Sequence, residues 1–74
     1  MTVDVELFGQ LAQGRPRRQA LTLERAMTVR EVASLLQIDT EHIGLIAIDN
    51  VQCELDDRVA PDCRLCFFPP MSGG

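Results

Sequence analysis

The sequence predicts an α+β domain of two layers, in which one main helix packs on a mixed sheet of about four to five strands. Two observations predict this class. Segments with strand-like patterns lie toward both ends of the chain, and one segment between them has the apolar period of an amphipathic helix. Because 74 residues hold a single core, one face of the sheet must cover that helix.

The first two strands are predicted from alternation. Apolar and polar residues alternate over residues 3–8, which indicates a half-buried strand with Phe8 on the side of its polar residues. Residues 9–18 contain two glycines and a proline and predict a loop, with one helical turn around residues 10–12. Alternation resumes over residues 19–24, so this second strand is expected to pair with the first as a hairpin.

The helix is predicted over residues 28–37. Thr28 and Glu31 have the spacing of a capping box, in which the threonine hydroxyl accepts from the Glu31 N–H and the glutamate reaches back to the Thr28 N–H. The apolar residues that follow share one helical face, which is expected to lie on the sheet. They are Val29, Val32, Ala33 and Leu36.

The second half of the chain predicts more strands. Residues 45–48 are apolar on both faces, a turn signal at Asp49-Asn50 follows, and residues 51–53 form a short strand at most. An acidic segment over residues 54–63 is expected to be anchored inward by Leu55 and Val59. The last strand, residues 64–68, then completes a strand–strand–helix–strand–strand order. With the first and last strands central and parallel, that order is a β-grasp.

A docking surface is predicted on the outer face of the last strand. Alternation turns Leu65 and Phe67 toward the helix, and it places Cys66 and Phe68 on the other face with Phe8. If these three are exposed together they form an apolar patch, and monomers avoid large patches unless a partner binds there. Burial beneath the first loop is the alternative.

The chain is organised around its last six residues: Pro69, Pro70, Met71, Ser72, Gly73 and Gly74. Two prolines have no N–H to continue a central strand, so they stiffen the chain into an extended exit. Glycine has no Cβ and can pass a narrow channel. Six extended residues span roughly 20 Å. We therefore expect a domain over residues 1–68 and a tail over residues 69–74 that presents the Gly74 carboxylate; a frayed end is the alternative.

Composition excludes several function classes. The net charge of −4 argues against nucleic acid and suits a partner with a basic pocket. No apolar run approaches the roughly 20 residues that a membrane helix needs, and no secretory signal is apparent, so a cytoplasmic protein is expected. The odd number of cysteines predicts reduced thiols. All seven basic residues are arginines, so the chain offers no side-chain amine for isopeptide attachment.

The remaining candidate sites favour structural explanations, and no metal site is predicted. Cys63 and Cys66 are spaced as Cys-x-x-Cys, but residues three apart on a strand face opposite sides. His42 has no catalytic partner and is assigned to a turn. The basic stretch at residues 15–18 is more typical of a solvated loop than of a docking site, and Asp56-Asp57 more typical of a turn than of a cation site.

Four stretches of the chain resemble the ubiquitin-like sulfur carriers MoaD and ThiS: residues 5–12, 26–32, 48–50 and 67–74. The last stretch is the specific one. Its ending, Phe-Phe-Pro-Pro-Met-Ser-Gly-Gly, is most similar to the small subunit of molybdopterin synthase, since the thiazole branch usually lacks the proline pair. The resemblance covers the whole chain.

The resemblance implies a carrier with no active site of its own and no bound cofactor. An adenylyltransferase of the ubiquitin-activating type would use ATP and magnesium to adenylate the carboxylate of Gly74, and a sulfur donor would then form the thiocarboxylate. The large subunit of molybdopterin synthase would receive the sulfur. Phe8, Phe68 and Met71 are expected to dock these partners. The alternatives are a carrier for thiamine thiazole or cysteine synthesis, a ubiquitin-like protein modifier, and a binding or toxin–antitoxin module with an idle tail.

Overall fold

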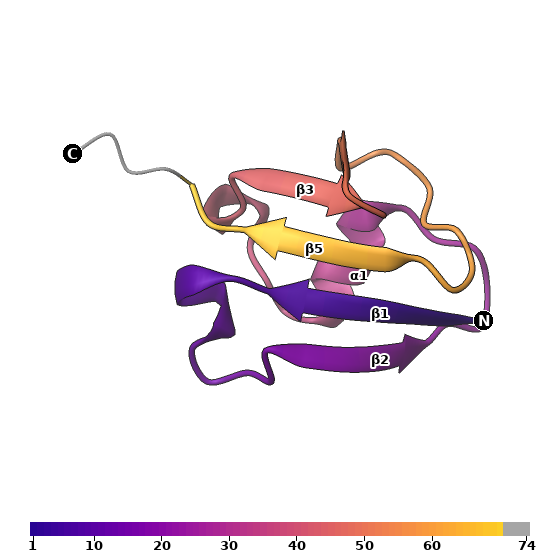
Figure 1. Cartoon of the computed structure of the whole chain (residues 1–74), viewed down its shortest axis with the longest axis horizontal. Coiled ribbons are helices and arrows are strands. Elements are labelled where there is room, and N and C mark those ends of the chain that lie inside the picture. Colours follow the sequence, from indigo (N-terminus) through magenta and orange to yellow (C-terminus); the bar gives the residue numbers. More distant parts are fainter. Residues whose placement is uncertain (71–74) are drawn as a thin grey trace.

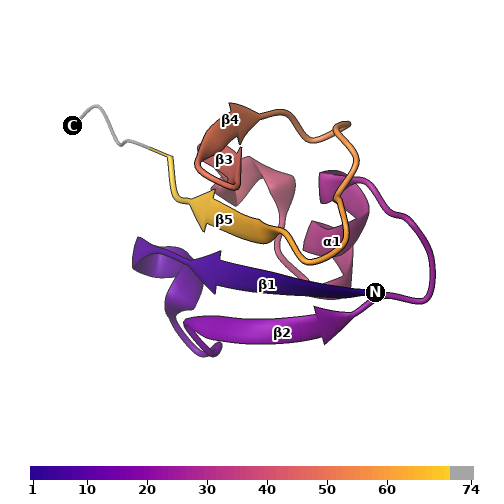
Figure 2. The same ribbon diagram turned by 45° about the vertical axis from the view of Figure 1, so that its right-hand side comes forward.

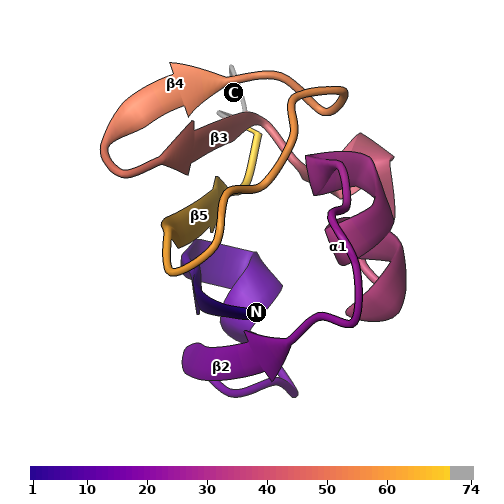
Figure 3. The same cartoon turned by 90° about the vertical axis from the view of Figure 1, so that its right-hand side faces the viewer.

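The computed structural model describes residues 1–70 as a five-stranded sheet with one α-helix on one face. Figure 1 shows the strands edge to edge, and Figure 3, viewed along the sheet, shows α1 on one side of it. The strands follow the spatial order β2-β1-β5-β3-β4. The elements are β1 (Thr2–Leu7), η1 (Gly9–Ala12), β2 (Arg18–Thr22), α1 (Val29–Leu35), η2 (Thr40–His42), β3 (Leu45–Ile48), β4 (Val51–Cys53) and β5 (Arg64–Phe68), where η denotes a 3₁₀ turn.

The sheet has the predicted β-grasp topology. β1 and β5 are parallel neighbours at its centre, with Val5 opposite Leu65. β2 pairs antiparallel with β1, and β3 pairs antiparallel with β5 so that Ile46 lies opposite Phe67. Figure 2 shows β3 and β4 on one side of β5, and β1 and β2 on the other. The last strand is therefore central, as the sequence predicted.

The core lies between the sheet and α1. The inward residues predicted from alternation in β1 and β5 are buried, and the largest fully buried side chains include Phe67, Leu7 and Leu65. In β2, Leu21 is only partly buried. From the helix, Val29, Val32 and Ala33 are fully buried against them. These contacts supply most of the apolar burial that stabilises a domain of this size.

The capping box at the start of α1 is confirmed. The backbone N–H of Glu31 donates to Thr28 Oγ1 at 3.2 Å, and the backbone N–H of Thr28 donates to Glu31 Oε1 at 3.0 Å. These bonds satisfy two donors that the first helical turn would otherwise leave free. None of the helices in residues 1–70 combines the length and the apolar composition needed to cross a membrane.

The helix ends earlier than the predicted residue 37. Gln37 has a positive φ of 58°, and the next N–H, of Ile38, donates back to the Ala33 carbonyl at 2.9 Å. The Gln37 N–H donates to the Ser34 carbonyl at 3.0 Å. This is a Schellman ending, which is usually made with glycine. The prediction missed it because glutamine gives no stop signal.

β2 covers Arg18–Thr22 and not the predicted residues 19–24. The strand ends where its partner does, because Thr22 pairs with Thr2 at the beginning of β1. Leu23 is still buried, and its N–H donates to the Met1 carbonyl at 2.7 Å. The inward alternation therefore continues for one residue beyond the ladder.

Candidate functional site: the base of the C-terminal tail

The tail leaves the sheet from the end of its central strand. On one side the Phe8 N–H donates to the Phe67 carbonyl at 3.1 Å, and on the other the Gly44 N–H donates to the Phe68 carbonyl at 2.8 Å. β5 is thus bonded on both sides up to its last residue. The ladder stops at Pro69 and Pro70, which have no N–H, as predicted. Figures 1 and 2 show this end of β5 opposite the N-terminus.

Two glycines lie against the described part of the tail. A Cβ on Gly44 would meet the Pro70 Cα at 2.5 Å, the Pro69 carbonyl oxygen at 2.7 Å and the Pro70 nitrogen at 2.8 Å. A Cβ on Gly9 would meet the Pro69 Cγ at 2.8 Å. Gly9 also has a φ of +58°, which other residues rarely adopt. Glycine is therefore favoured at both positions, by the backbone contacts at Gly44 and by the backbone conformation at Gly9.

Sequence reasoning missed both glycines as parts of the site. In the sequence Gly9 only helps to predict a loop, and Gly44 belongs to no recognisable motif. The signal for Gly44 lay in the register, since the residue before β3 must lie beside the residue after β5 once Leu45 pairs with Phe68. That register is not readable from either segment alone.

Phe8 and Phe68 lie on the same face, as predicted. Their rings are stacked with centroids 4.4 Å apart and planes 16° apart, and both side chains are half-buried. Leu45, the cross-strand partner of Phe68, is 40% exposed, and Pro69 continues the surface toward the tail. We call these four residues, Phe8, Leu45, Phe68 and Pro69, the tail-base patch. A shallow groove borders it, lined by Gly44, Leu45, Phe68, Pro69 and Pro70.

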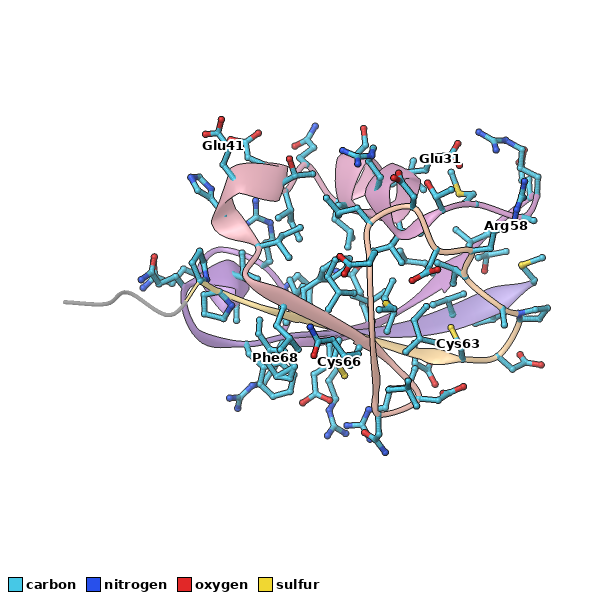
Figure 4. The ribbon with its side chains drawn as sticks, turned by 90° about the horizontal axis from the view of Figure 1, so that it is seen from above. Glu31, Glu41, Arg58, Cys63, Cys66 and Phe68 are labelled. Atoms are coloured by element: carbon cyan, nitrogen blue, oxygen red, sulfur yellow. The ribbon has the colours of Figure 1, made fainter. Side chains whose placement is uncertain are left out.

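The prediction that Cys66 is exposed with the two phenylalanines is wrong. Cys66 points away from α1, as Figure 4 shows, but only 7% of it is exposed. It lies between its cross-strand neighbours Glu6 and Ala47, and the burial raises the pKa of its thiol. Cys66 therefore packs among its neighbours on the outer face of the sheet and contributes little exposed surface beside the tail-base patch.

An ion cluster that the sequence did not reveal covers the next part of this face. Glu6 is 7% exposed although alternation places it outward. It accepts a hydrogen bond from the Arg64 guanidinium, and its Oε2 lies 3.5 Å from the Nε of Arg18. The hydrogen bond from Arg64, together with the charge of Arg18, holds the pKa of the Glu6 carboxyl below its usual value. Two arginines thus meet one carboxylate beside the tail-base patch.

The other candidates behave as structural residues. Cys63 lies in the core and Cys66 on the opposite face, so the Cys-x-x-Cys pair does not converge. His42 ends the short turn η2. The Asp57 carboxylate accepts from the Glu54 N–H at 2.7 Å, which makes this acidic segment a turn, as predicted. Within residues 1–70 no three or more His, Cys, Asp or Glu side chains gather in a group able to hold a metal.

The predicted roles of Met71, Ser72, Gly73 and Gly74 fall outside the described residues. What the structure defines is the rigid start of their path. A β-grasp domain whose central strand β5 leads directly into two prolines has the architecture of ubiquitin-like proteins.

The chain belongs to the ThiS family, whose family model matches residues 5–74; this is a family of ubiquitin-like sulfur carriers. It is similar in structure to SAMP1 from Haloferax volcanii, with a TM-score of 0.76 and 21% identity over the whole of both chains. It is also similar to a putative molybdopterin converting factor subunit 1 from Pyrococcus furiosus, with a TM-score of 0.74 and 18% identity. That match covers 96% of this chain and 99% of the other.

A third similar structure is a complex of subunits 1 and 2 of the molybdopterin-converting factor from Helicobacter pylori. Its matched chain gives a TM-score of 0.67 and 19% identity, with both chains fully covered. At these identities the solved structures establish the fold. No curated protein is similar enough to the chain to count as a relative.

Proposed function

We propose that this chain is the sulfur-carrying small subunit of a molybdopterin synthase, and that the carboxylate of Gly74 is its reactive group. An adenylyltransferase of the ubiquitin-activating type charges that carboxylate at the expense of ATP, with magnesium. The sulfur then passes to a pterin precursor in the large subunit. The observation that carries the proposal is the tail base, where the central strand, two prolines and two close glycines direct the chain outward beside an apolar patch.

The chemistry explains why a carrier needs such a tail. A carboxylate is a poor electrophile, so its oxygen first attacks ATP, giving the acyl adenylate and pyrophosphate. Sulfide then attacks the acyl carbon, AMP leaves, one proton is released, and a thiocarboxylate remains. The carbon–sulfur bond keeps the sulfur covalently held until the second active site takes it. Tethered delivery replaces free diffusion of sulfide with a high effective concentration.

The molybdopterin branch is favoured by the form of the ending. The pair Pro69-Pro70 resembles that branch. This assignment is supported by the position of the two prolines, which follow the last residue of β5 and lie against Gly9 and Gly44. A large-subunit partner is supported by the Helicobacter pylori structure, in which a chain of this fold is complexed with subunit 2. A reaction centre within the domain itself is not required, because both partners supply their own.

Docking is assigned to the tail-base patch. Its aromatic and aliphatic side chains are exposed enough to be covered by a partner, and they surround the point where the tail leaves. Aromatic residues commonly carry much of the energy of such interfaces. Both partners must bind the same tail, so they are expected to use this patch in turn.

Intact-mass measurement tests the function. The chain is incubated with ATP, magnesium, its adenylating enzyme and sulfide, and the expected product carries one sulfur in place of one oxygen. The matched control extends the chain by one residue beyond Gly74, which removes the glycine carboxylate while leaving the domain unchanged, and no mass increase is expected. A wild-type chain that gains no sulfur, or an extended chain that gains it, contradicts the proposal.

The same preparation separates the alternatives. Co-purification with a synthase large subunit supports the molybdopterin assignment, whereas a charged carrier that sulfurates only a thiazole or cysteine precursor assigns the chain to those pathways. Ligation of the chain to other proteins through Gly74 supports the modifier reading. The chain's own side chains offer no lysine as an acceptor, so a conjugate between two copies could form only through the N-terminal amine.

A further inference from the structure

We propose that Gly44 is the positioning residue of the tail: it fixes the direction in which the chain leaves β5, and hence where the reactive end arrives in a partner. The inference deepens the proposed function and rests on it. Docking on the tail-base patch brings the carrier to its partner, but the reaction occurs at the far end of the tail. The direction of the tail at its base is therefore a separate requirement from the affinity of the carrier for its partner.

The contact at Gly44 is made with backbone, which leaves little room for adjustment. The three atoms that a Cβ would meet belong to the main chain of Pro69 and Pro70, at 2.5–2.8 Å. Real Cβ atoms essentially never approach so closely, so one side must move. By contrast, a Cβ on Gly9 would meet the ring carbons of Pro69, which can yield by ring puckering.

The tail is the side that moves. Gly44 is tied to the sheet by the hydrogen bond from its N–H to the Phe68 carbonyl, and the ladder continues at once with Leu45 opposite Phe68. Pro69 and Pro70 donate no backbone hydrogen bond, and Pro70 is exposed. A methyl group at position 44 therefore displaces Pro70 while β3 and β5 keep their register.

The displacement has a calculable scale. Ordinary van der Waals contact begins at 3.4 Å, so relieving the 2.5 Å contact requires a shift of about 1 Å at Pro70. Prolines hold φ fixed, so fewer backbone dihedrals are free to absorb the shift locally, and part of it is passed on as a change of direction. A misplacement of about 1 Å at a reacting group can lower a rate by on the order of 100-fold. We therefore expect Gly44→Ala to lower kcat of adenylation by roughly 10- to 100-fold.

The two requirements separate in the kinetics. Gly44→Ala leaves Phe8 and Phe68 in place, so KM for the carrier is expected to stay at the wild-type value while kcat falls. Loss of the tail-base patch has the opposite signature, a raised KM, because it removes binding that ground state and transition state share. ATP–pyrophosphate exchange by the adenylating enzyme, measured over a range of carrier concentrations, gives both constants.

Gly14→Ala is the matched control. Gly14 has a φ of +71° and no atom within 4 Å of a would-be Cβ, so this change strains the first loop without touching the tail. Its Tm is expected to fall while kcat and KM remain those of wild type. Such a result shows that loss of stability alone does not reproduce the effect of Gly44→Ala. A wild-type kcat in Gly44→Ala, or an equal fall of kcat in Gly14→Ala, overturns the proposal.

A variant with both prolines replaced, Pro69→Gly with Pro70→Gly, completes a double-mutant cycle and guards against misfolding of Gly44→Ala. A flexible tail can move away from the methyl group without a defined change of direction. Gly44→Ala is therefore expected to cause no further fall in kcat when both prolines are already replaced by glycine. Full additivity of the two effects contradicts the inference, because independent sites add and coupled ones do not.

A structural readout needs no activity. In wild type, the Hα protons of Gly44 and Pro70 are expected to give a nuclear Overhauser contact, which disappears in Gly44→Ala while contacts between Leu45 and Phe68 persist. Persistence of the first contact, or loss of the second, refutes the inference. If the wild-type chain is never adenylated, the proposed function fails, and this measurement still decides whether Gly44 directs the tail.

Discussion

Phe67 and Phe68 are adjacent on β5 and provide a matched pair of perturbations. Phe67 is fully buried between the sheet and α1, whereas Phe68 is half-buried on the outer face and stacked on Phe8. Each is replaced by alanine, which removes the same atoms from the same strand. The structure predicts opposite consequences, loss of the fold for the first and loss of the partner for the second.

The magnitudes follow from burial. Phe67→Ala empties a sealed site and is expected to cost about 3–5 kcal/mol, a large part of the roughly 4–11 kcal/mol typical of a chain of 74 residues. Phe68→Ala loses the stacking on Phe8 and the buried part of a half-buried ring, and is expected to cost about 1–2 kcal/mol. In urea, where a chain of this size loses on the order of 1 kcal/mol per molar, the two midpoints are expected to be clearly separated.

Circular dichroism during urea denaturation measures both losses, since the chain contains no Trp or Tyr for fluorescence. Binding of the adenylating enzyme by folded Phe68→Ala, and by the more severe Phe68→Asp, is then measured by calorimetry. Equal destabilisation by Phe67→Ala and Phe68→Ala would show that Phe68 belongs to the core. Wild-type affinity of Phe68→Asp would remove the tail-base patch from the docking surface.

Three further changes test local features of the domain. The folded pKa of Glu6 lies below its usual 4.5. The cluster with Arg64 is therefore expected to stabilise the fold fully above that value and to lose its contribution as the pH falls through the folded pKa. Glu6→Gln should flatten the pH dependence of the urea midpoint across this range. Thr28→Ala removes the cap of α1 and is expected to cost about 1 kcal/mol, with Thr28→Ser near wild type. Gln37→Gly relieves a left-handed residue at the helix end and is expected to raise Tm; a lower Tm would mean that the Gln37 side chain contributes more than its backbone strain costs.

Local patterns were enough to predict most of the fold. The capping box at Thr28 and Glu31, the alternation in β1 and β5 and the turn at Asp49-Asn50 depend on residues close in sequence, and each is present in the structure. The central position of β5 also followed from the order of the elements. Errors occurred at boundaries, where an element ends because its partner does, as β2 ends opposite Thr2.

The candidate site was harder to predict from the sequence, because the register of strand pairing brings its residues together. Gly44 and Pro70 are close only once β3 and β5 pair, and no local pattern distinguishes Gly44 from a loop glycine. Burial on the outer face was misjudged for a related reason. Alternation says which side Cys66 faces, but whether it is exposed depends on neighbours from β1 and β3.

The central place of β5 has a mechanical consequence. Hydrogen bonds run from it to β1 on one side and to β3 on the other, across the strand direction. A force applied to the tail along the strand direction would load both ladders in shear at once, whereas a force at right angles to the edge strand β4 would open its hydrogen bonds one after another. The domain would therefore resist unfolding when it is held by the end of β5.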